Sequence, residues 1–285
     1  MALDNEQTSV GIIGCGWLGH PLAKTLLKQH ASVIATRSSA ENTAVLGAQG
    51  IDARVLLLPA STAESVLALN QHPVFSQQSL VIAITPQFRQ GRTDYSEKIG
   101  QLVNAAREQG CVNRIILLSS TAAYNGLCGD VNETSSLNFL ADKVQILNEA
   151  EQAVLGFACP ENNRKSYVLR LAGLVGPERH PGKFIKSGRL FSSSSAPVNL
   201  IHQEDALGLI LSLLTTKTDS GIFNGVSQTH VSKKDYYRAA AKALSLPMPS
   251  FSDDAAASLK KIVSGVKAEQ ILSYQFVYPD LLTWL

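Results

Sequence analysis

Six residues near the N-terminus have the spacing of a phosphate-binding loop. The segment 14–19 reads GCGWLG, a G-x-G-x-x-G pattern between a short apolar run and a stretch with helical spacing, which is the context that a dinucleotide-binding loop requires. In such a loop Gly14 permits a tight turn, Gly16 lets the backbone approach a pyrophosphate, and Gly19 allows close packing of helix on strand. The alternative is a tight turn without a ligand. We expect every residue of the loop to contact the cofactor, namely Gly14, Cys15, Gly16, Trp17, Leu18 and Gly19.

The residues after the second apolar run determine whether a protein of this kind prefers NAD or NADP. An NAD-binding protein carries Asp or Glu about 20 residues beyond the glycine loop, where the carboxylate binds the ribose 2′-OH. Here Arg37 and Ser38 occupy this place, and an arginine flanked by hydroxyl groups can hold a 2′-phosphate through charge-assisted hydrogen bonds. The sequence therefore predicts NADP, with NAD as the less favoured cofactor, unless Arg37 is only a solvated loop charge. Thr85, after the fourth apolar run, is expected at the same site.

A second set of residues that could do chemistry follows the fifth apolar run, where the sequence 119–124 reads SSTAAY. Ser120 lies outside a G-x-S-x-G pattern, and no Asp–His pair is placed to activate it, so a serine hydrolase is not indicated. Three later segments accompany these hydroxyl groups: 170–177 reads RLAGLVGP, 180–182 reads HPG, and 199–205 reads NLIHQED. With the glycine loop, they make nearly the whole chain similar to the extended short-chain dehydrogenase/reductases of the NAD-dependent epimerase/dehydratase family, and more narrowly to its atypical bacterial YeeZ-like members.

The resemblance implies roles for the residues around the fifth strand. In this family a Ser or Thr before the strand-five Tyr hydrogen-bonds the reacting carbonyl or hydroxyl, which points to Ser120, with Thr121 as its substrate-binding neighbour. A Tyr-x-x-x-Lys motif on the next helix completes the site, because the lysine lowers the pKa of the tyrosine and binds the ribose, and tyrosinate acts as general base. The best match here is FLADK at 139–143, whose first and last residues are expected on one helix face.

This match lacks the residue that moves the proton. Lys143 could still bind the ribose, or be a surface lysine, but Phe139 has no proton to transfer. Three explanations are open: Tyr124 or His180 transfers the proton, the reaction needs no tyrosinate, or the protein binds its cofactor without turnover. Tyr124 could instead be an aromatic residue packed beside the site, and His180 could be a loop residue rather than a ligand contact.

Positive charge gathers in the segment 177–197. One acid, Glu178, stands against four bases there, in a chain whose net charge is only +2. The resemblance implies that this segment faces the substrate, often a nucleoside-diphosphate sugar, and Arg and Lys suit a diphosphate. The alternative is a solvated loop. The four bases are Arg179, Lys183, Lys186 and Arg189, of which we expect Arg179 and Lys183, together with His180, to contact an anionic substrate.

The elements that must position these residues alternate over the first two thirds of the chain. Near-continuous apolar strands separated by helices are typical of a parallel sheet covered on both faces. We therefore predict a Rossmann-type, doubly wound α/β fold whose ligand lies at the carboxyl ends of the strands. The predicted strands are 9–13, 32–36, 54–58, 80–84, 114–118 and 167–171, and the predicted helices are 17–28, 41–46, 62–69, 94–108 and 137–155.

The regular alternation of predicted strands and helices ends after residue 171. A loop at 176–196, a helix at 205–214 and a strand at 221–226 precede a helix and irregular chain. We predict a dinucleotide-binding domain and a smaller substrate-binding lobe. The domain comprises 1–171 with 198–228 returning to it, and the lobe comprises 172–197 and 229–285.

Composition excludes several classes of protein. With 45% hydrophobic and 17% charged residues among 285, the chain has enough apolar surface to fold, so intrinsic disorder is excluded as its main state. The net charge gives no support for a nucleic-acid partner. No apolar run approaches the ~20 residues of a membrane span, and the N-terminus lacks a signal pattern. Four cysteines without metal or disulfide spacing predict no metal site and a cytoplasmic protein.

Two functions from different classes are consistent with these residues. The first is an NADP-dependent oxidoreductase or epimerase-like enzyme that acts on a hydroxyl or carbonyl group of a small molecule, such as a nucleotide sugar. The second is a non-catalytic NADP(H)-binding sensor, because Phe139 stands where the family has its tyrosine. The resemblance also implies a homodimer.

Overall fold

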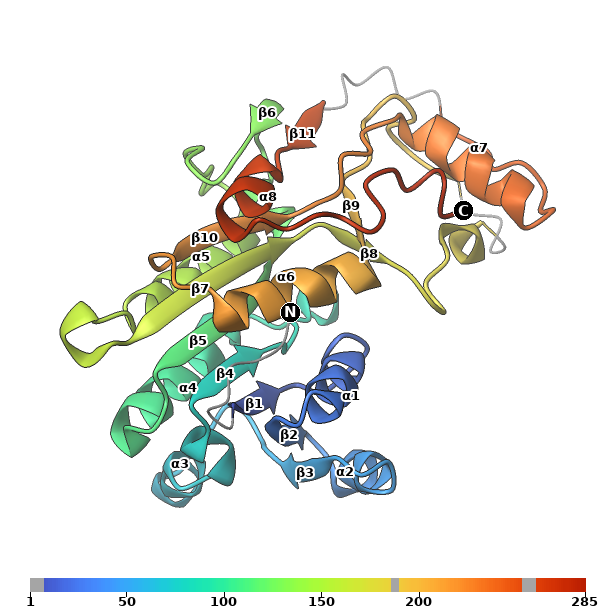
Figure 1. Cartoon of the computed structure of the whole chain (residues 1–285). Helices are drawn as coiled ribbons and strands as arrows, with labels where there is room; N and C mark the ends of the chain where they lie inside the picture. The colour runs from blue at the N-terminus through green and yellow to red at the C-terminus, as the bar shows by residue number, and fades with distance from the viewer. Residues whose placement is uncertain (1–7, 186–189, 253–259) are drawn as a thin grey trace. The chain divides into compact units, whose positions relative to one another are not determined.

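A seven-stranded sheet organises the chain in the computed structural model, which describes residues 8–185, 190–252 and 260–285. Its strands are β1 (Ser9–Ile13), β2 (Ser32–Arg37), β3 (Asp52–Val55), β4 (Ser79–Ile82), β5 (Arg114–Ser120), β7 (Lys165–Leu171) and β10 (Gly221–Gly225). They follow the order β10-β7-β5-β4-β1-β2-β3 (Figure 1). Strand β1 pairs in parallel with β2 and β4, and β2–β3 and β4–β5 are also parallel. This arrangement confirms the predicted Rossmann-type, doubly wound fold.

The order of the strands defines where a ligand of such a sheet lies. From β1 the chain passes through β2 to β3 on one side, and then through β4 to β5 on the other. Ligands of doubly wound sheets bind at the carboxyl ends of the strands beside this reversal, which here falls between β1 and β4. The ends of these two strands therefore position the candidate site.

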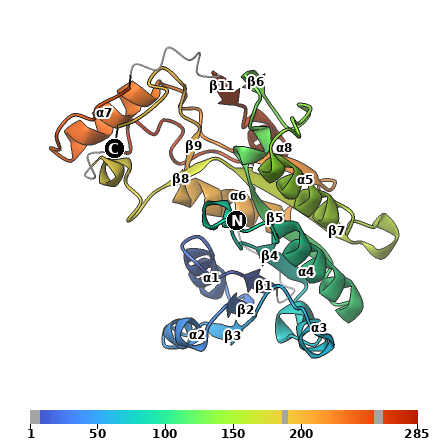
Figure 2. The ribbon, with the colours of Figure 1, turned by 180° about the vertical axis from the view of Figure 1, so that it is seen from behind.

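Helices of the expected spacing connect the strands. They are α1 (Gly19–Lys28), α2 (Ala40–Gly47), α3 (Ala63–Asn70), α4 (Tyr95–Gln109), α5 (Asp142–Leu155), α6 (Gln203–Thr215), α7 (Lys233–Ala243) and α8 (Val266–Leu272). Figures 1 and 2 both show α1 and α2 on one side of β1 and β2, and α3 on the other. The apolar face of α4 is buried at Tyr95, Ile99, Leu102, Val103 and Ala106.

The chain divides into two compact units. The first comprises Met1–Ser119, Gln145–Leu169 and Ile210–Ile222, and the second comprises Ser120–Val144, Arg170–Leu209 and Phe223–Leu285. The second unit contains two further parallel strand pairs, β6 (Gly129–Val131) with β11 (Lys261–Val263), and β8 (Gly173–Val175) with β9 (Leu200–His202). The domain boundaries expected from the sequence stay a prediction.

The start of α5 differs from the expectation. The helix predicted over 137–155 begins only at Asp142, because the side chain of Asn138 accepts a hydrogen bond from the backbone of Leu140 (3.0 Å) and holds a turn there. The side chain of Leu140 is 92% exposed, so its apolar character did not mark a buried helix face. Phe139 therefore precedes the helix, and the expectation that it shares a helix face with Lys143 is wrong.

Other strand boundaries in the structure differ from the predicted ones, because a continuous apolar run does not show where a strand ends. Strand β3 ends at Val55 instead of continuing to Leu58, and Leu57 is 66% exposed. The short strands β6, β8, β9 and β11 have three residues each, too few for an alternating pattern to be recognised in the sequence. Lys186 and Arg189, two bases of the segment 177–197, lie outside the described residues.

None of the helices within the described ranges is both long enough and apolar enough to cross a membrane.

An alanine in place of Gly11 in β1 should destabilise the sheet. Its Cβ would lie 2.6 Å from Leu80 Cδ2 and 2.7 Å from the carbonyl oxygen of Val74, and relieving such a buried overlap costs about 1–3 kcal/mol. Gly100→Ala in α4 is the matched control, because nothing lies within 4 Å of the added Cβ and alanine should stabilise the helix by up to about 1 kcal/mol. Urea denaturation measures both free energies of unfolding. A Gly11→Ala protein as stable as the wild type would contradict the close packing.

Candidate functional site

The glycine loop after β1 is tied to the end of β2. The backbone N–H of Gly14 donates to Thr36 Oγ1 (3.3 Å), and the N–H of Cys15 donates to the Thr36 carbonyl oxygen (2.9 Å). Gly14 has φ +92°, and a Cβ there would lie 3.0 Å from the backbone nitrogen of Ile84. Because a side chain would be strained and crowded at this position, glycine is required for the turn.

The other two glycines fit the roles expected of them. Gly19 begins α1, and a Cβ there would lie 3.0 Å from the Gly14 carbonyl oxygen and 3.2 Å from Ile12 Cγ2, so the helix packs closely on β1. A Cβ at Gly16 would meet only Arg37 Nη1 at 3.4 Å and the Gly14 carbonyl oxygen at 4.0 Å. The first turn of α1 contains no acidic residue, so its N-terminus is electrostatically suited to a phosphate.

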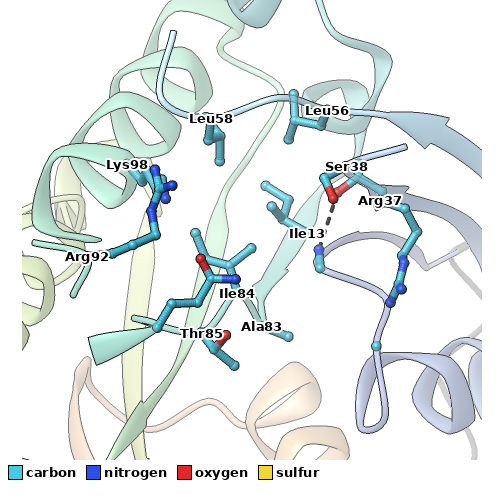
Figure 3. Close-up of a pocket in the computed structure, with 14 residues that line it drawn as sticks. Ile13, Arg37, Ser38, Leu56, Leu58, Ala83, Ile84, Thr85, Arg92 and Lys98 are labelled. Atoms are coloured by element: carbon cyan, nitrogen blue, oxygen red, sulfur yellow. Dashed lines mark hydrogen bonds between the residues drawn. The ribbon is translucent and has the colours of Figure 1, made fainter. Parts of the chain in front are cut away.

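A cavity of about 460 Å³ opens at the carboxyl ends of β1 to β4 (Figure 3). Its lining contains three ionisable side chains, which are all cations, and no carboxylate, so it favours an anionic ligand. Backbone and side chains from four successive strand ends contribute to it, as the fold predicts. The lining residues are Ile13, Gly14, Gly16, Thr36, Arg37, Ser38, Leu56, Leu58, Ala83, Ile84, Thr85, Gln87, Arg92 and Lys98.

Arg37 forms one side of this cavity. Its Nη1 donates a hydrogen bond to the carbonyl oxygen of Cys15 (2.9 Å), which fixes the half-buried guanidinium against the glycine loop. Ser38, beside it, is exposed. The structure thus brings the predicted residues Gly14, Gly16, Arg37 and Ser38 together at one cavity, and Thr85 joins them from the end of β4.

Two cations that sequence reasoning missed form the opposite side of the cavity (Figure 3). Arg92 and Lys98 both pair with Asp94, the residue before α4; the Lys98 Nζ–Asp94 Oδ1 distance is 3.0 Å. Hydrogen bonding from Arg92 holds the pKa of Asp94 at about 2, so the carboxylate stays ionised and keeps both cations in place. The spacing of Asp94 and Lys98, one turn apart at the start of a predicted helix, was the available signal.

Three residues of the glycine loop do not line the cavity. Cys15 is 2% exposed and Leu18 is buried beside it in the loop, whereas Trp17 is partly exposed, and none of the three lines the cavity. Burial raises the pKa of the Cys15 thiol to about 11, although the positive charge of Arg37 opposes this shift. A role for Cys15 or Leu18 in cofactor binding would therefore have to use the backbone.

The hydroxyl-rich segment after β5 forms a 3-10 turn in the second unit. Ser120 begins the turn over Thr121–Tyr124, and its Oγ accepts a hydrogen bond from the N–H of Ala122 (3.1 Å). Ser120 and Thr121 are both partly exposed. The Ser120 hydroxyl hydrogen is not used in this contact, so it can be donated to a substrate oxygen.

Tyr124 is fully buried at the end of this turn. Its hydroxyl donates to Asn224 Oδ1 (2.9 Å), and the guanidinium of Arg170 lies 4.8 Å from the centre of its ring. The Asn224 N–H in turn donates to Glu133 Oε1 (2.7 Å). Burial raises the pKa of Tyr124. These contacts favour the interpretation of Tyr124 as a packed aromatic residue over that of a proton donor.

The remaining predicted residues also lie in the second unit. Lys143 is exposed in the first turn of α5. His180 Nδ1 accepts a hydrogen bond from the N–H of Gly182 (3.1 Å), and burial lowers the pKa of its ring. Lys183 Nζ donates to the carbonyl oxygen of Glu178 (2.9 Å), and Arg179 is exposed. His180 thus caps its own turn, whereas Lys143, Arg179 and Lys183 are accessible to a ligand.

Within the described residues, the His, Cys, Asp and Glu side chains form no group of three or more that could hold a metal ion.

The buried thiol of Cys15 should not react with 5,5′-dithiobis(2-nitrobenzoate) in the native protein at pH 8, because the thiolate is the nucleophile and a pKa of about 11 leaves almost none of it. The exposed Cys111 and Cys128 are internal controls and should react rapidly. Mass mapping of the modified cysteines makes this comparison, with full reaction of Cys15 expected only in urea. Rapid native labelling of Cys15 would show that the glycine loop opens.

Comparison with known proteins agrees with this geometry. No protein-family model matches the chain. Protein YeeZ of Escherichia coli (strain K12) is 31% identical over 275 residues, which cover 96% of this chain and 97% of that protein.

Solved structures with the same fold include two enzymes. UDP-N-acetylglucosamine 4-epimerase from Bacillus cereus has a TM-score of 0.75 and 16% identity over 95% of this chain and 94% of that chain. The Bordetella bronchiseptica enzyme WbmG, in complex with NAD, has a TM-score of 0.76 and 15% identity over 99% and 94%. The identity of 31% over nearly the full length of both chains shows that this chain belongs to the YeeZ family.

Proposed function

We propose that this chain binds NADP(H) in the cavity at the ends of β1 to β4 and acts as an oxidoreductase or epimerase-like enzyme on a hydroxyl or carbonyl group. The observation that carries the proposal is the charge of the cavity: Arg37 stands at the end of β2, and no carboxylate is among the lining residues. An NAD ribose would need an acceptor for its 2′-OH at this place. A 2′-phosphate would instead accept hydrogen bonds from Arg37 and Ser38.

The glycine loop supports the same orientation of the cofactor. The open space at Gly16 and the N-terminus of α1 suit the pyrophosphate, and Leu56 and Leu58 offer an apolar wall to the adenine. The complex of WbmG holds NAD, so the preference for NADP proposed here is a difference from that structural neighbour, and Arg37 is its physical reason.

The chain's own residues would then bind and orient a substrate. The bound dinucleotide supplies or accepts a hydride. Ser120, partly exposed with its hydroxyl hydrogen available, would donate a hydrogen bond to the reacting oxygen, and Lys143 would bind the ribose. Phe139 moves no proton. The substrate class that we propose is a small anionic molecule such as a nucleotide sugar, since Arg179 and Lys183 are exposed cations and one structural neighbour is a UDP-N-acetylglucosamine 4-epimerase.

A non-catalytic NADP(H) sensor is the second candidate. It is favoured by two observations: Phe139 lies ahead of α5 and is 53% exposed, and the hydroxyl of Tyr124 is fully buried on Asn224. Neither side chain is then placed as the family's tyrosine is expected to be. A sensor needs the cavity but no proton donor, so cofactor binding alone does not separate the two functions.

Arg37→Ala should weaken NADPH binding by about 10- to 100-fold and leave NADH binding nearly unchanged, because only NADPH loses the charge-assisted hydrogen bonds to its 2′-phosphate. Isothermal titration calorimetry measures both affinities. Arg54→Ala is the matched control, since Arg54 pairs with Asp52 on the surface of β3 and does not line the cavity. Tighter binding of NADH by the wild type, or an unchanged affinity ratio in Arg37→Ala, would contradict the assignment of NADP.

Ser120→Ala should reduce turnover on the order of 100-fold if the chain is an enzyme, because a donor to the reacting oxygen is lost. NADPH absorbance with a panel of keto-sugar nucleotides and simple ketones measures the rate. Ser120→Thr keeps the hydroxyl and is the control. An unchanged rate of turnover in Ser120→Ala would contradict the assignment of Ser120 to the site. Tight NADPH binding without turnover of any compound in the panel would favour the sensor.

A further inference from the structure

Lys261 begins a short strand whose position is fixed from both sides. Strand β11 pairs in parallel with β6, where Lys261 stands opposite Gly129. The side chain of Asn199 holds the strand on its other side: Nδ2 donates to the Lys261 carbonyl oxygen (2.9 Å), and Oδ1 accepts from the N–H of Val263 (2.8 Å). The backbone of β11 at Lys261 is therefore held from two sides, by β6 and by Asn199.

The ammonium group of Lys261 reaches the turn after β5. Its Nζ donates a hydrogen bond to the carbonyl oxygen of Tyr124 (3.1 Å), the last residue of the 3-10 turn that Ser120 begins. The side chain is only partly exposed. One backbone acceptor uses one of the three donors of an ammonium group, so two donors are available to a ligand at this turn.

The segment that leads into α5, and with it a second cation, approaches this turn. The chain after the turn packs against the segment that leads into α5, because a Cβ at Gly126 would lie 2.8 Å from Asn138 Nδ2. Lys143 stands in the first turn of α5. Its positive charge, together with burial as the larger cause, lowers the pKa of Lys261. The two ammonium groups therefore interact electrostatically.

No ion pair joins Lys143 or Lys261 to a carboxylate in the described part of the chain. Two interacting like charges, one of them half-buried, carry a desolvation and repulsion cost. An anion bound between them would offset this cost, because hydrogen bonds from an ammonium group to a phosphate or carboxylate oxygen are charge-assisted.

We propose that Lys261 and Lys143 form an oxyanion subsite that binds a phosphate or carboxylate group of the substrate beside Ser120. The inference rests on the proposed function in so far as that function places the substrate at Ser120, and it narrows the substrate to compounds with an anionic group close to the reacting oxygen. Lys143 can serve both this group and the ribose, since its ammonium has three donors.

Lysine methylation with ¹³C-formaldehyde gives the test, because it labels each amine and keeps its charge. The Lys261 signal of the full chain, assigned from its absence in Lys261→Met, is followed by NMR while inorganic pyrophosphate, UDP or glucuronate is added. We expect the signal to shift and saturate. The apparent affinity should fall about tenfold or more in Lys261→Met, measured on the Lys143 signal. Lys260→Met, at the exposed neighbouring lysine, should leave it unchanged.

Lys261→Arg is the control for misfolding of the Lys261→Met protein. It keeps the cation and should retain most of the affinity for the probes. Response to pyrophosphate and UDP identifies a phosphate subsite, and response to glucuronate alone identifies a carboxylate subsite. A Lys261 signal that none of the three probes moves would overturn the proposal. Equal affinity of the wild type and Lys261→Met for the probes would overturn it too.

Calorimetry with NADPH on the same samples tests the proposed function separately. Lys261→Met should bind NADPH like the wild type, and failure of the wild type to bind NADPH would refute only the cofactor assignment.

Discussion

The hydrogen bonds between Thr36 and the glycine loop are the constraint on which the cavity depends. The N–H groups of Gly14 and Cys15 both donate to Thr36, and Arg37 returns a hydrogen bond to the Cys15 carbonyl oxygen (2.9 Å). The end of β2 and the turn after β1 therefore form one reciprocally bonded unit. This unit fixes the positions of both the surface suited to the pyrophosphate and the guanidinium suited to a 2′-phosphate.

The cavity in the first unit is lined by cations that suit an anionic ligand. Each of these cations is also held by a partner in the protein. Arg37 is held by a backbone carbonyl, while Arg92 and Lys98 are held by Asp94, which lies beside the cavity and is not among its lining residues. In the second unit the arrangement is different, because Lys261 is held by a carbonyl and Lys143 lies close enough to repel it. Each cation of the first arrangement is held by a hydrogen bond or an ion pair, whereas the two lysines of the second repel each other.

The fold and half of the candidate site could be predicted from local patterns. The glycine loop and Arg37 follow directly from spacing between apolar runs, and the structure brings Gly14, Gly16 and Arg37 to one cavity. The start of α5 could not be predicted, because the turn at Asn138 overrides an apolar periodicity that includes the exposed Leu140. Lys261 could not be found either, since its approach to Tyr124 depends on contacts between residues more than a hundred positions apart in the chain.

The bond from Arg37 to the glycine loop also limits how this protein could change its cofactor during evolution or in the laboratory. Exchange of Arg37 for an acid would remove its hydrogen bond to the loop and place a carboxylate near the carbonyl oxygen of Cys15, two acceptors that repel each other. If Arg37 selects NADP as proposed, cofactor preference and the order of the loop depend on the same side chain, and a change of preference to NAD would require compensating changes in the loop.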